Sequence, residues 1–257
     1  MVHLFKKGEM ALLLGAERSF MVRIDGSMAR LKGARGGVLT SRLIDMKAGE
    51  RIAIGDLEFL LLRPDIRDHI ENIERGPQII IPKDASEIVW GLALSNGSRV
   101  LEGGAGSGGL TLFLLNSVSP GGTVYSYDTR EEHLKMTASN VEKAGLLGQW
   151  EGRIGDVTEH VDQHDLDAAV LDIPEPEHAL TVLAGSLKVG GRFCAYVPTT
   201  NQLERVTISL IAKGFGSVEP FELIRRPYSV KEGATRPVTE MLSHTGFLVF
   251  ARWMGSP

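Results

Sequence analysis

The stretch VLEGGAGSGG, from Val100 to Gly109, decides how this chain folds. The apolar residues up to Leu101 predict a buried strand that ends at the acid Glu102, and five glycines then fall within seven residues. An apolar segment from Leu110 to Val118 predicts a helix directly after them. Glycine lets a backbone turn sharply and approach a ligand closely, and the start of a helix offers free N–H groups. A strand, a glycine loop and a helix in this order form the nucleotide pocket of doubly wound α/β folds.

The glycine spacing fits two kinds of nucleotide site. Gly104, Gly106 and Gly109 fit G-x-G-x-x-G, the dinucleotide pattern. Glu102 followed by Gly104, Gly106 and Gly108 resembles motif I of the S-adenosylmethionine-dependent methyltransferases. A pyrophosphate favours N–H groups without a nearby anion, whereas S-adenosylmethionine has no phosphate and carries a sulfonium and an ammonium. The acid at position 102 therefore favours a methyltransferase over a dinucleotide enzyme.

The composition is that of an ordinary globular protein of 257 residues, enough for one large domain and a small one. Cys194 is the only cysteine, which excludes an internal disulfide and favours the reducing cytoplasm. No signal peptide opens the chain and no apolar run reaches membrane-spanning length, so we expect no membrane partner.

The net charge of −4 conceals an asymmetry between the two ends of the chain. Residues 1–54 hold ten Lys or Arg against five Asp or Glu, so this part carries +5 and the remainder −9. A basic module joined to an acidic body is one way to hold a polyanion. A chance imbalance in a small domain is the alternative.

The chain divides by pattern into three parts. Residues 1–62 show short apolar runs separated by turn signals and predict a small all-β domain. Residues 63–76 form a charged join, and 77–257 alternate strands with helices. Five strands in that alternation, followed by two without a helix between them, predict a seven-stranded doubly wound α/β sheet with an antiparallel edge. In the first helix we expect Asp84 as N-cap and Glu87 at the third position, as in a capping box.

Acids end four of the expected strands, where ligands bind in open α/β sheets: Glu102, Asp128, Asp156 and Asp172. Asp128 can accept both ribose hydroxyls of either nucleoside cofactor. Asp156 either accepts the adenine amino group or is the N-cap of a helix over VTEHV (157–161). Asp172 opens the segment D-I-P-E-P, whose prolines stiffen the loop, and we expect a catalytic or substrate role rather than a structural turn.

Six stretches together resemble one family, the class I methyltransferases that form N1-methyladenosine at position 58 in the T-loop of tRNA, bacterial and archaeal branch. They are RGPQIIIPKDASEIV (75–89), RVLEGGAGSGGLTLFL (99–114), SYDTREEHLKMTASNV (126–141), DAAVLDIPEP (167–176), GGRFCAYVPTTNQLERV (190–206) and HTGFLVFAR (244–252). With the β-rich beginning they cover nearly the whole chain. Motif I is generic, but Pro-Lys-Asp, Asp-x-Pro-x-Pro, Tyr-x-Pro-x-x-x-Gln and the terminal His-x-Gly-Phe-Leu are specific in combination.

The resemblance implies S-adenosylmethionine as methyl donor, a homotetramer, and a tRNA substrate whose target base is flipped out of a structured loop. It implies that Asp172 faces the target adenine, and that Tyr196, Pro198 and Gln202 shape the base pocket. Arg236 and His244 become candidates for RNA contact or pocket closure. The residues expected to bind the cofactor are Gln78, Glu102, Gly104, Ala105, Gly106, Ser107, Gly108, Asp128, Asp156 and Asp172.

Three positions depart from the family pattern. Ile81 stands where relatives often have an aromatic residue or His, Glu177 stands where Trp is usual, and Asp128 is shorter than the usual Glu. The first two leave open which base is methylated, and the third is conservative for a ribose contact.

Parts of the sequence also fit two other functions and one other ligand. An NAD(P)-dependent oxidoreductase would use the same glycines, and a catalytically inactive RNA-binding subunit would keep the same fold. His160 and His164 lie four residues apart, but no third ligand accompanies them, so we expect a solvated turn and no metal.

Overall fold

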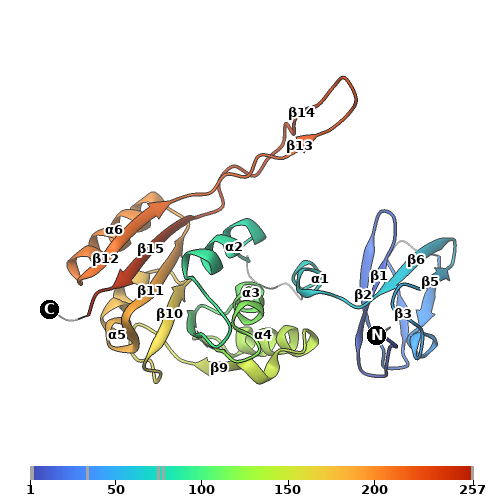
Figure 1. The fold of residues 1–257 in the computed structure, drawn as a ribbon, viewed down its shortest axis with the longest axis horizontal. Helices are drawn as coiled ribbons and strands as arrows, with labels where there is room; N and C mark the ends of the chain where they lie inside the picture. Colours follow the sequence, from blue (N-terminus) through green and yellow to red (C-terminus); the bar gives the residue numbers. More distant parts are fainter. Residues whose placement is uncertain (1–2, 33–34, 74–75, 77–78, 256–257) are drawn as a thin grey trace. The chain divides into compact units, whose positions relative to one another are not determined.

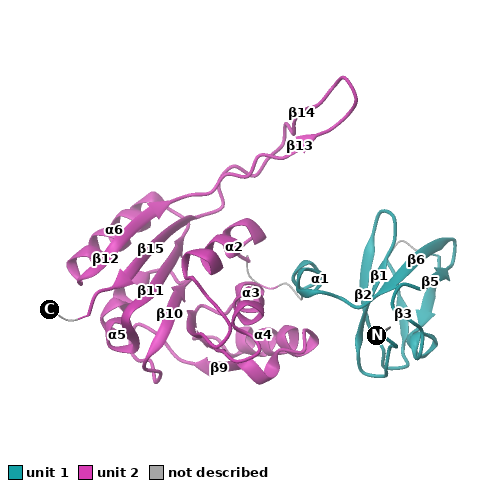
Figure 2. Ribbon diagram, viewed as in Figure 1, with its two compact units in different colours: residues 1–73 teal, residues 74–257 magenta. Residues whose placement is uncertain are grey.

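The computed structural model describes residues 3–32, 35–73, 76 and 79–255. Within it the chain forms two compact units, residues 1–73 and residues 74–257 (Figure 2). The division falls inside the segment 63–76 that the sequence marks as a join.

Unit 1 is built from short antiparallel strands. Its main sheet has the order β2-β1-β6-β5, and a separate pair joins β3 to β4. The strands are β1 (Met10–Leu14), β2 (Ser19–Arg23), β3 (Met28–Arg30), β4 (Gly37–Leu39), β5 (Arg51–Ile54) and β6 (Leu57–Leu62). Alternate residues of β5 point into a core that contains Phe5, Leu13 and Phe59. A 3-10 turn (Thr40–Leu43) and the short helix α1 (Ile66–Glu71) complete the unit.

Unit 2 contains the expected seven-stranded sheet, in the order β12-β15-β11-β10-β7-β8-β9 (Figure 1). Its strands are β7 (Arg99–Gly103), β8 (Thr123–Asp128), β9 (Trp150–Ile154), β10 (Leu166–Leu171), β11 (Leu187–Val197), β12 (Phe215–Phe221) and β15 (Phe247–Trp253). Neighbours from β11 to β9 run parallel, and β15 lies antiparallel to both β11 and β12. The glycine-loop strand β7 is therefore central, with β10 and β8 on either side.

Helices cover both faces of this sheet (Figure 1). On one face α2 (Pro82–Gly91), α3 (Gly109–Val118) and α4 (Glu131–Lys143) pack in a row. On the other, α5 (Leu180–Ser186) and α6 (Thr200–Ala212) bury apolar residues against the outer strands. Two 3-10 turns, Leu147–Gln149 and Pro176–Ala179, precede β9 and α5. None of the helices in the described part of the chain has the length and apolar character that crossing a bilayer requires.

The start of α2 differs from the expectation. Ile81 is the N-cap and Pro82 occupies the first helical position, so Asp84 lies inside the first turn and caps nothing. Proline suits the first helical position because its fixed φ is already helical and its missing N–H would have no partner there. The expected capping box of Asp84 and Glu87 is therefore wrong, and the buried carboxylate of Asp84 needs another explanation.

Residues 222–246, here called the arm, connect β12 to β15 and extend away from the sheet (Figure 1). Two short strands, β13 (Tyr228–Ser229) and β14 (Arg236–Pro237), pair antiparallel within it. Phe247 at the start of β15 pairs with Val197 at the end of β11. The arm therefore leaves the sheet at the carboxyl edge of its parallel strands, where ligands bind in this class of fold.

Candidate active site

A cavity of about 330 Å³ lies at the carboxyl ends of β7 to β10. Three of the four strand-end acids line it, and Glu102 is not among the lining residues. The cavity is lined by Gly104, Tyr127, Asp128, Thr129, Arg130, Gly155, Asp156, Val157, Thr158, Asp172, Ile173, Pro174, Glu175 and His178. The fold thus brings together side chains from four separate strand ends.

Gly104 joins the glycine loop to the neighbouring strands. Its N–H donates to the carbonyl of Tyr127 (2.8 Å), and the N–H of Asp172 donates to the carbonyl of Gly103 (2.8 Å). Gly104 has φ +89°, and a Cβ there would lie 2.2 Å from the Asp172 carbonyl oxygen. Only glycine allows this approach, and it places the loop directly against the backbone of Asp172.

The helix α4 holds the glycine loop from the other side. Asn140 Nδ2 donates to the carbonyl of Ser107 (2.9 Å), and Thr137 Oγ1 donates to the carbonyl of Gly106 (3.3 Å). Ala105 and Ser107 are buried, and Ser107 Oγ has no partner among the described residues. No local sequence pattern marks these helix contacts, because Thr and Asn in a helix carry no distinctive spacing.

Backbone and side-chain groups hold Asp128 at the end of β8, among them Arg130, whose Nε lies 3.9 Å from Oδ1. Its Oδ1 accepts from the backbone N–H of Arg130 (3.0 Å), and its Oδ2 accepts from the N–H of Gly106 (3.1 Å). The buried ring of His133 lies beside Oδ2, with Nδ1 at 3.0 Å. No sequence pattern marks His133 as part of this site. The carboxylate is fixed before any ligand binds.

Glu102 lies fully buried behind the glycine loop. Its Oε2 accepts from Thr111 Oγ1 (2.7 Å) and Ser126 Oγ (2.5 Å), while Oε1 has no partner among the described residues. Burial raises the pKa of Glu102 to about 7, and the two hydroxyl donors oppose that increase. The site therefore contains a buried acceptor oxygen that no described donor satisfies.

Asp156 begins the segment after β9, which forms a turn and not the helix expected over 157–161. Its Oδ1 accepts from the N–H of Thr158 (2.8 Å), as a capping side chain does. The residue also lines the cavity. One carboxylate thus has a structural contact and a position that a ligand can reach, so the two alternatives for Asp156 are compatible.

Asp172 opens into the cavity at the end of β10. No described residue donates a hydrogen bond to its carboxylate, and desolvation by the surrounding protein raises its pKa to about 6. The loop after it is held by α6, because Gln202 Nε2 donates to the carbonyl of Pro174 (2.9 Å). An ion pair between Arg205 Nε and Glu177 Oε1 (2.8 Å) adds a second tie. The family departure at Glu177 is therefore part of the support of this loop.

Tyr196 lies beside Asp172 in the neighbouring strand, because Leu171 of β10 pairs with Ala195 of β11. Its hydroxyl donates to the carbonyl of Thr245 (2.6 Å), and burial raises its pKa to about 12. The phenol ring is therefore held in one position.

Gln78, which the sequence places near the cofactor, lies outside the described residues.

Arg236 and His244 belong to the arm. Arg236 is exposed in β14, donates to Thr239 Oγ1 (3.0 Å), and does not line the cavity. His244 lies at the base of the arm, with Nδ1 at 2.9 Å from Glu222 Oε2 and Nε2 at 3.2 Å from the carbonyl of Pro198. The bond to Glu222 raises the pKa of His244.

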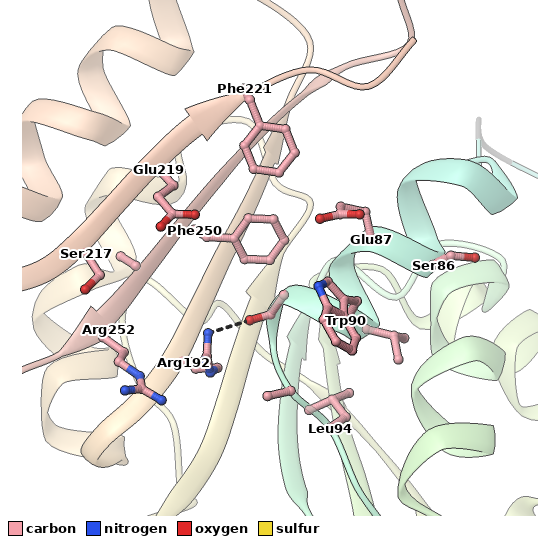
Figure 3. A pocket seen from close by; sticks show the side chains of 14 residues that line it. Ser86, Glu87, Trp90, Leu94, Arg192, Ser217, Glu219, Phe221, Phe250 and Arg252 are labelled. Atoms are coloured by element: carbon pink, nitrogen blue, oxygen red, sulfur yellow. Dashed lines mark hydrogen bonds between the residues drawn. The ribbon is translucent and has the colours of Figure 1, made fainter. Parts of the chain in front are cut away.

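A second cavity, of about 700 Å³, lies between α2 and the outer strands (Figure 3). Phe221 and Phe250 stack on its wall with ring centroids 5.7 Å apart, and Arg192 donates to the carbonyl of Gly91 (2.9 Å). None of the strand-end acids lines it. The smaller cavity therefore remains the candidate active site.

Among the described residues, no group of three or more His, Cys, Asp or Glu is arranged to hold a metal ion. His160 pairs with Asp162 at the surface (2.8 Å), and His164 Nδ1 lies 3.4 Å from the carbonyl of Gly185. The two histidines contact different partners and do not form a common site.

A seven-stranded sheet in this order, with a glycine loop after its central strand and acids at the adjacent strand ends, defines the class I methyltransferase fold. Residues 69–235 match the family described as "tRNA methyltransferase complex GCD14 subunit". The chain belongs to this family, the tRNA adenine-N1 methyltransferases.

Individual relatives agree with that assignment. The chain is 31% identical over 256 residues to tRNA (adenine(58)-N(1))-methyltransferase TrmI of Thermus thermophilus, covering 98% of this chain and 96% of that protein. It is 30% identical over 220 residues to the tRNA (adenine(57)-N(1)/adenine(58)-N(1))-methyltransferase TrmI of Methanocaldococcus jannaschii, covering 76% and 78%.

Two solved structures share the whole architecture. A protein of Thermotoga maritima described as a SAM-dependent O-methyltransferase has a TM-score of 0.88 at 31% identity, covering 99% of this chain and 96% of that one. The tRNA (m1A58) methyltransferase TrmI of Aquifex aeolicus has a TM-score of 0.79 at 29% identity, covering 97% and 98%. The family and fold predicted from the sequence are thus confirmed.

Proposed function

We propose that this protein transfers a methyl group from S-adenosylmethionine to N1 of adenosine 58 in the T-loop of tRNA. The observation that carries the proposal is an exposed Asp172 that lines the cavity beside a glycine loop and a fixed Asp128, within a chain of this family. We further propose that it acts in the cytoplasm as a homotetramer, as the family resemblance implies.

The charge of the cavity supports S-adenosylmethionine rather than a dinucleotide. The lining carries the carboxylates of Asp128, Asp156, Asp172 and Glu175 in addition to Arg130 and His178. Such a lining repels a pyrophosphate and suits a ligand with a sulfonium and an ammonium. S-adenosylmethionine, when bound, supplies an electrophilic methyl group. The glycine loop and Asp128 would hold its nucleoside part, with Asp156 as candidate acceptor for the adenine amino group.

Asp172 would act on the methyl acceptor. N1 of adenine already carries a lone pair, so no base is needed to begin, but methylation leaves the ring cationic. A carboxylate that accepts a hydrogen bond from the N6 amino group stabilises this developing charge. The stiff loop after Asp172, tied by Gln202, would keep the carboxylate in place, and Tyr196 would form a wall of the base pocket. The rate then depends mainly on alignment of the reacting atoms.

The direct test is nucleoside mass spectrometry. The protein is incubated with labelled S-adenosylmethionine and an unmodified tRNA transcript, and the tRNA is then digested and the labelled nucleoside mapped. We expect N1-methyladenosine at position 58. Label only in protein, or a methylated base other than adenine, would reject the proposal. A transcript with position 58 changed to another base serves as the control, and a second label at position 57 would extend the specificity.

Ligand binding separates the proposal from an NAD(P)-dependent oxidoreductase. A ligand that binds only the folded state raises the midpoint of thermal unfolding. We expect S-adenosylhomocysteine to raise the midpoint and NAD to leave it unchanged. The reverse result would favour the dinucleotide enzyme.

A further inference from the structure

Lys83 and Asp84 form a buried ion pair in the first turn of α2, away from the acids of the cavity. Lys83 Nζ donates to Asp84 Oδ1 (2.6 Å), and the two side chains are 10% and 0% exposed. The same nitrogen donates to the carbonyl of Leu223 (2.7 Å) and to Thr245 Oγ1 (2.7 Å), so its three protons all have acceptors.

Thr245 closes the network. Its hydroxyl accepts from Lys83 and donates to Asp84 Oδ2 (2.6 Å), so the threonine bridges both members of the ion pair. Leu223 lies two residues after β12, and Thr245 lies two residues before β15. One side chain of α2 therefore holds both ends of the arm.

The network also reaches Tyr196. The carbonyl of Thr245 accepts the hydroxyl of Tyr196 (2.6 Å). The next residue is Gly246, where a Cβ would lie 2.3 Å from Tyr196 Cζ, so the ring packs directly on this backbone. Because Tyr196 lies beside Asp172 across the β10–β11 pair, the network ends at the methyl-acceptor side of the cavity.

A buried ion pair is a weak source of stability, because the loss of hydration offsets much of the attraction between the charges. Apolar side chains could attach α2 to the sheet as well. A fully satisfied network of charged and hydroxyl groups instead allows one geometry, since any shift leaves a buried donor or acceptor without a partner. Simple packing would not require the Thr245 hydroxyl to accept and donate at once.

We propose that Lys83, Asp84 and Thr245 are positioning residues that fix Tyr196 and the base of the arm at the methyl-acceptor side of the active site. The inference rests on the proposed function for its catalytic consequence. Its structural part, the fixation of the two ends of the arm, stands independently of the substrate.

The substitution Thr245→Val tests the inference, with Thr245→Ser as the matched control. Valine keeps the shape of threonine and removes the hydroxyl, whereas serine keeps the hydroxyl. We expect Thr245→Val to lower kcat/KM for the tRNA transcript by about tenfold, as the loss of one hydrogen-bonding group does. Affinity for S-adenosylhomocysteine, measured by calorimetry, should stay at the wild-type value, and Thr245→Ser should restore methylation.

Hydrogen exchange provides a readout that does not depend on catalysis. In Thr245→Val we expect faster exchange in peptides that cover Tyr196 and both ends of the arm, and unchanged exchange in the glycine loop. Tyr196→Phe, which removes only the bond to the Thr245 carbonyl, should show a smaller change in the same direction and serves as the second variant if Thr245→Val fails to fold.

Two results would overturn the inference. One is Thr245→Val with wild-type methylation and wild-type exchange. The other is an equal loss of cofactor affinity and methylation together with a lower thermal midpoint, which would indicate a merely structural role. If the wild-type protein does not methylate tRNA adenosine while the exchange results hold, the proposed function fails and the fixation of the arm stands.

Discussion

Asp128 and Asp172 end strands on either side of β7, and their surroundings differ. Asp128 accepts from two backbone N–H groups and lies 3.0 Å from a buried histidine nitrogen. The carboxylate of Asp172 receives no hydrogen bond from the described residues, opens into the cavity, and has its pKa raised to about 6 by desolvation. The protein fixes the side chain of Asp128, whereas the carboxylate of Asp172 is open to a hydrogen bond from a ligand.

This difference suits two different tasks. A carboxylate that holds the same cofactor in every cycle benefits from being oriented beforehand, because less freedom is lost on binding. A carboxylate that stabilises charge only during the reaction is more effective when the substrate supplies its hydrogen bond, since the interaction then strengthens in the transition state. The comparison predicts that substitutions of the two acids affect different kinetic constants.

The largest effect should come from Asp172→Asn, which removes the charge and preserves the size of the side chain. We expect turnover to fall roughly 100- to 1,000-fold, as it does when a preorganised electrostatic contact is lost. Binding of S-adenosylhomocysteine, measured by calorimetry, should persist. Asp156→Asn is the control, because it makes the same charge change in the same cavity and should affect cofactor affinity instead. Full activity of Asp172→Asn would remove the proposed distinction between the two acids.

The pH dependence of the reaction sharpens the comparison. The pKa of Asp172 is raised from 3.8 to about 6, so the group is neutral below pH 6 and charged above it. Because the charged form is the active one in our proposal, kcat/KM should rise about tenfold per pH unit up to about pH 6 and then level off. Asp172→Asn should lack this limb. A wild-type profile that falls with increasing pH through this range would contradict the assignment.

The two acids also show what a sequence can and cannot predict. Their positions could be predicted because a buried strand, a following acid and the glycine spacing are all local patterns, and the parallel sheet then brings the strand ends together. The groups that surround the two acids could not be predicted in this way. Tyr196 and the Lys83 network depend on Thr245, which lies 162 residues from Lys83, and no local pattern encodes that contact. The residue type of Asp84 predicts a helix cap, whereas Pro82 sets the true start of the helix.

A smaller effect is expected from Asp128→Asn. The amide nitrogen would face one of the backbone donors that now bind the carboxylate, so the side chain would lose its fixed orientation. We expect affinity for S-adenosylhomocysteine to fall roughly 10- to 100-fold, the usual range for a hydrogen bond to a charged group. Turnover at saturating S-adenosylmethionine should stay near the wild-type value. A fall in turnover without a fall in affinity would show that Asp128 acts on the reaction itself.

The smallest effect should come from His133, which contacts Asp128 and does not line the cavity. His133→Ala removes the Nδ1 contact with Oδ2, and Asp128 keeps its two backbone donors and its ion pair with Arg130. We expect affinity for S-adenosylhomocysteine to weaken roughly three- to tenfold, in line with one hydrogen bond. His133→Asn is the matched variant, because its amide nitrogen can occupy the position of Nδ1 and should restore most of the affinity. If alanine and asparagine weaken binding equally, His133 acts through packing in α4, and the fixed orientation of Asp128 depends on the backbone donors and Arg130.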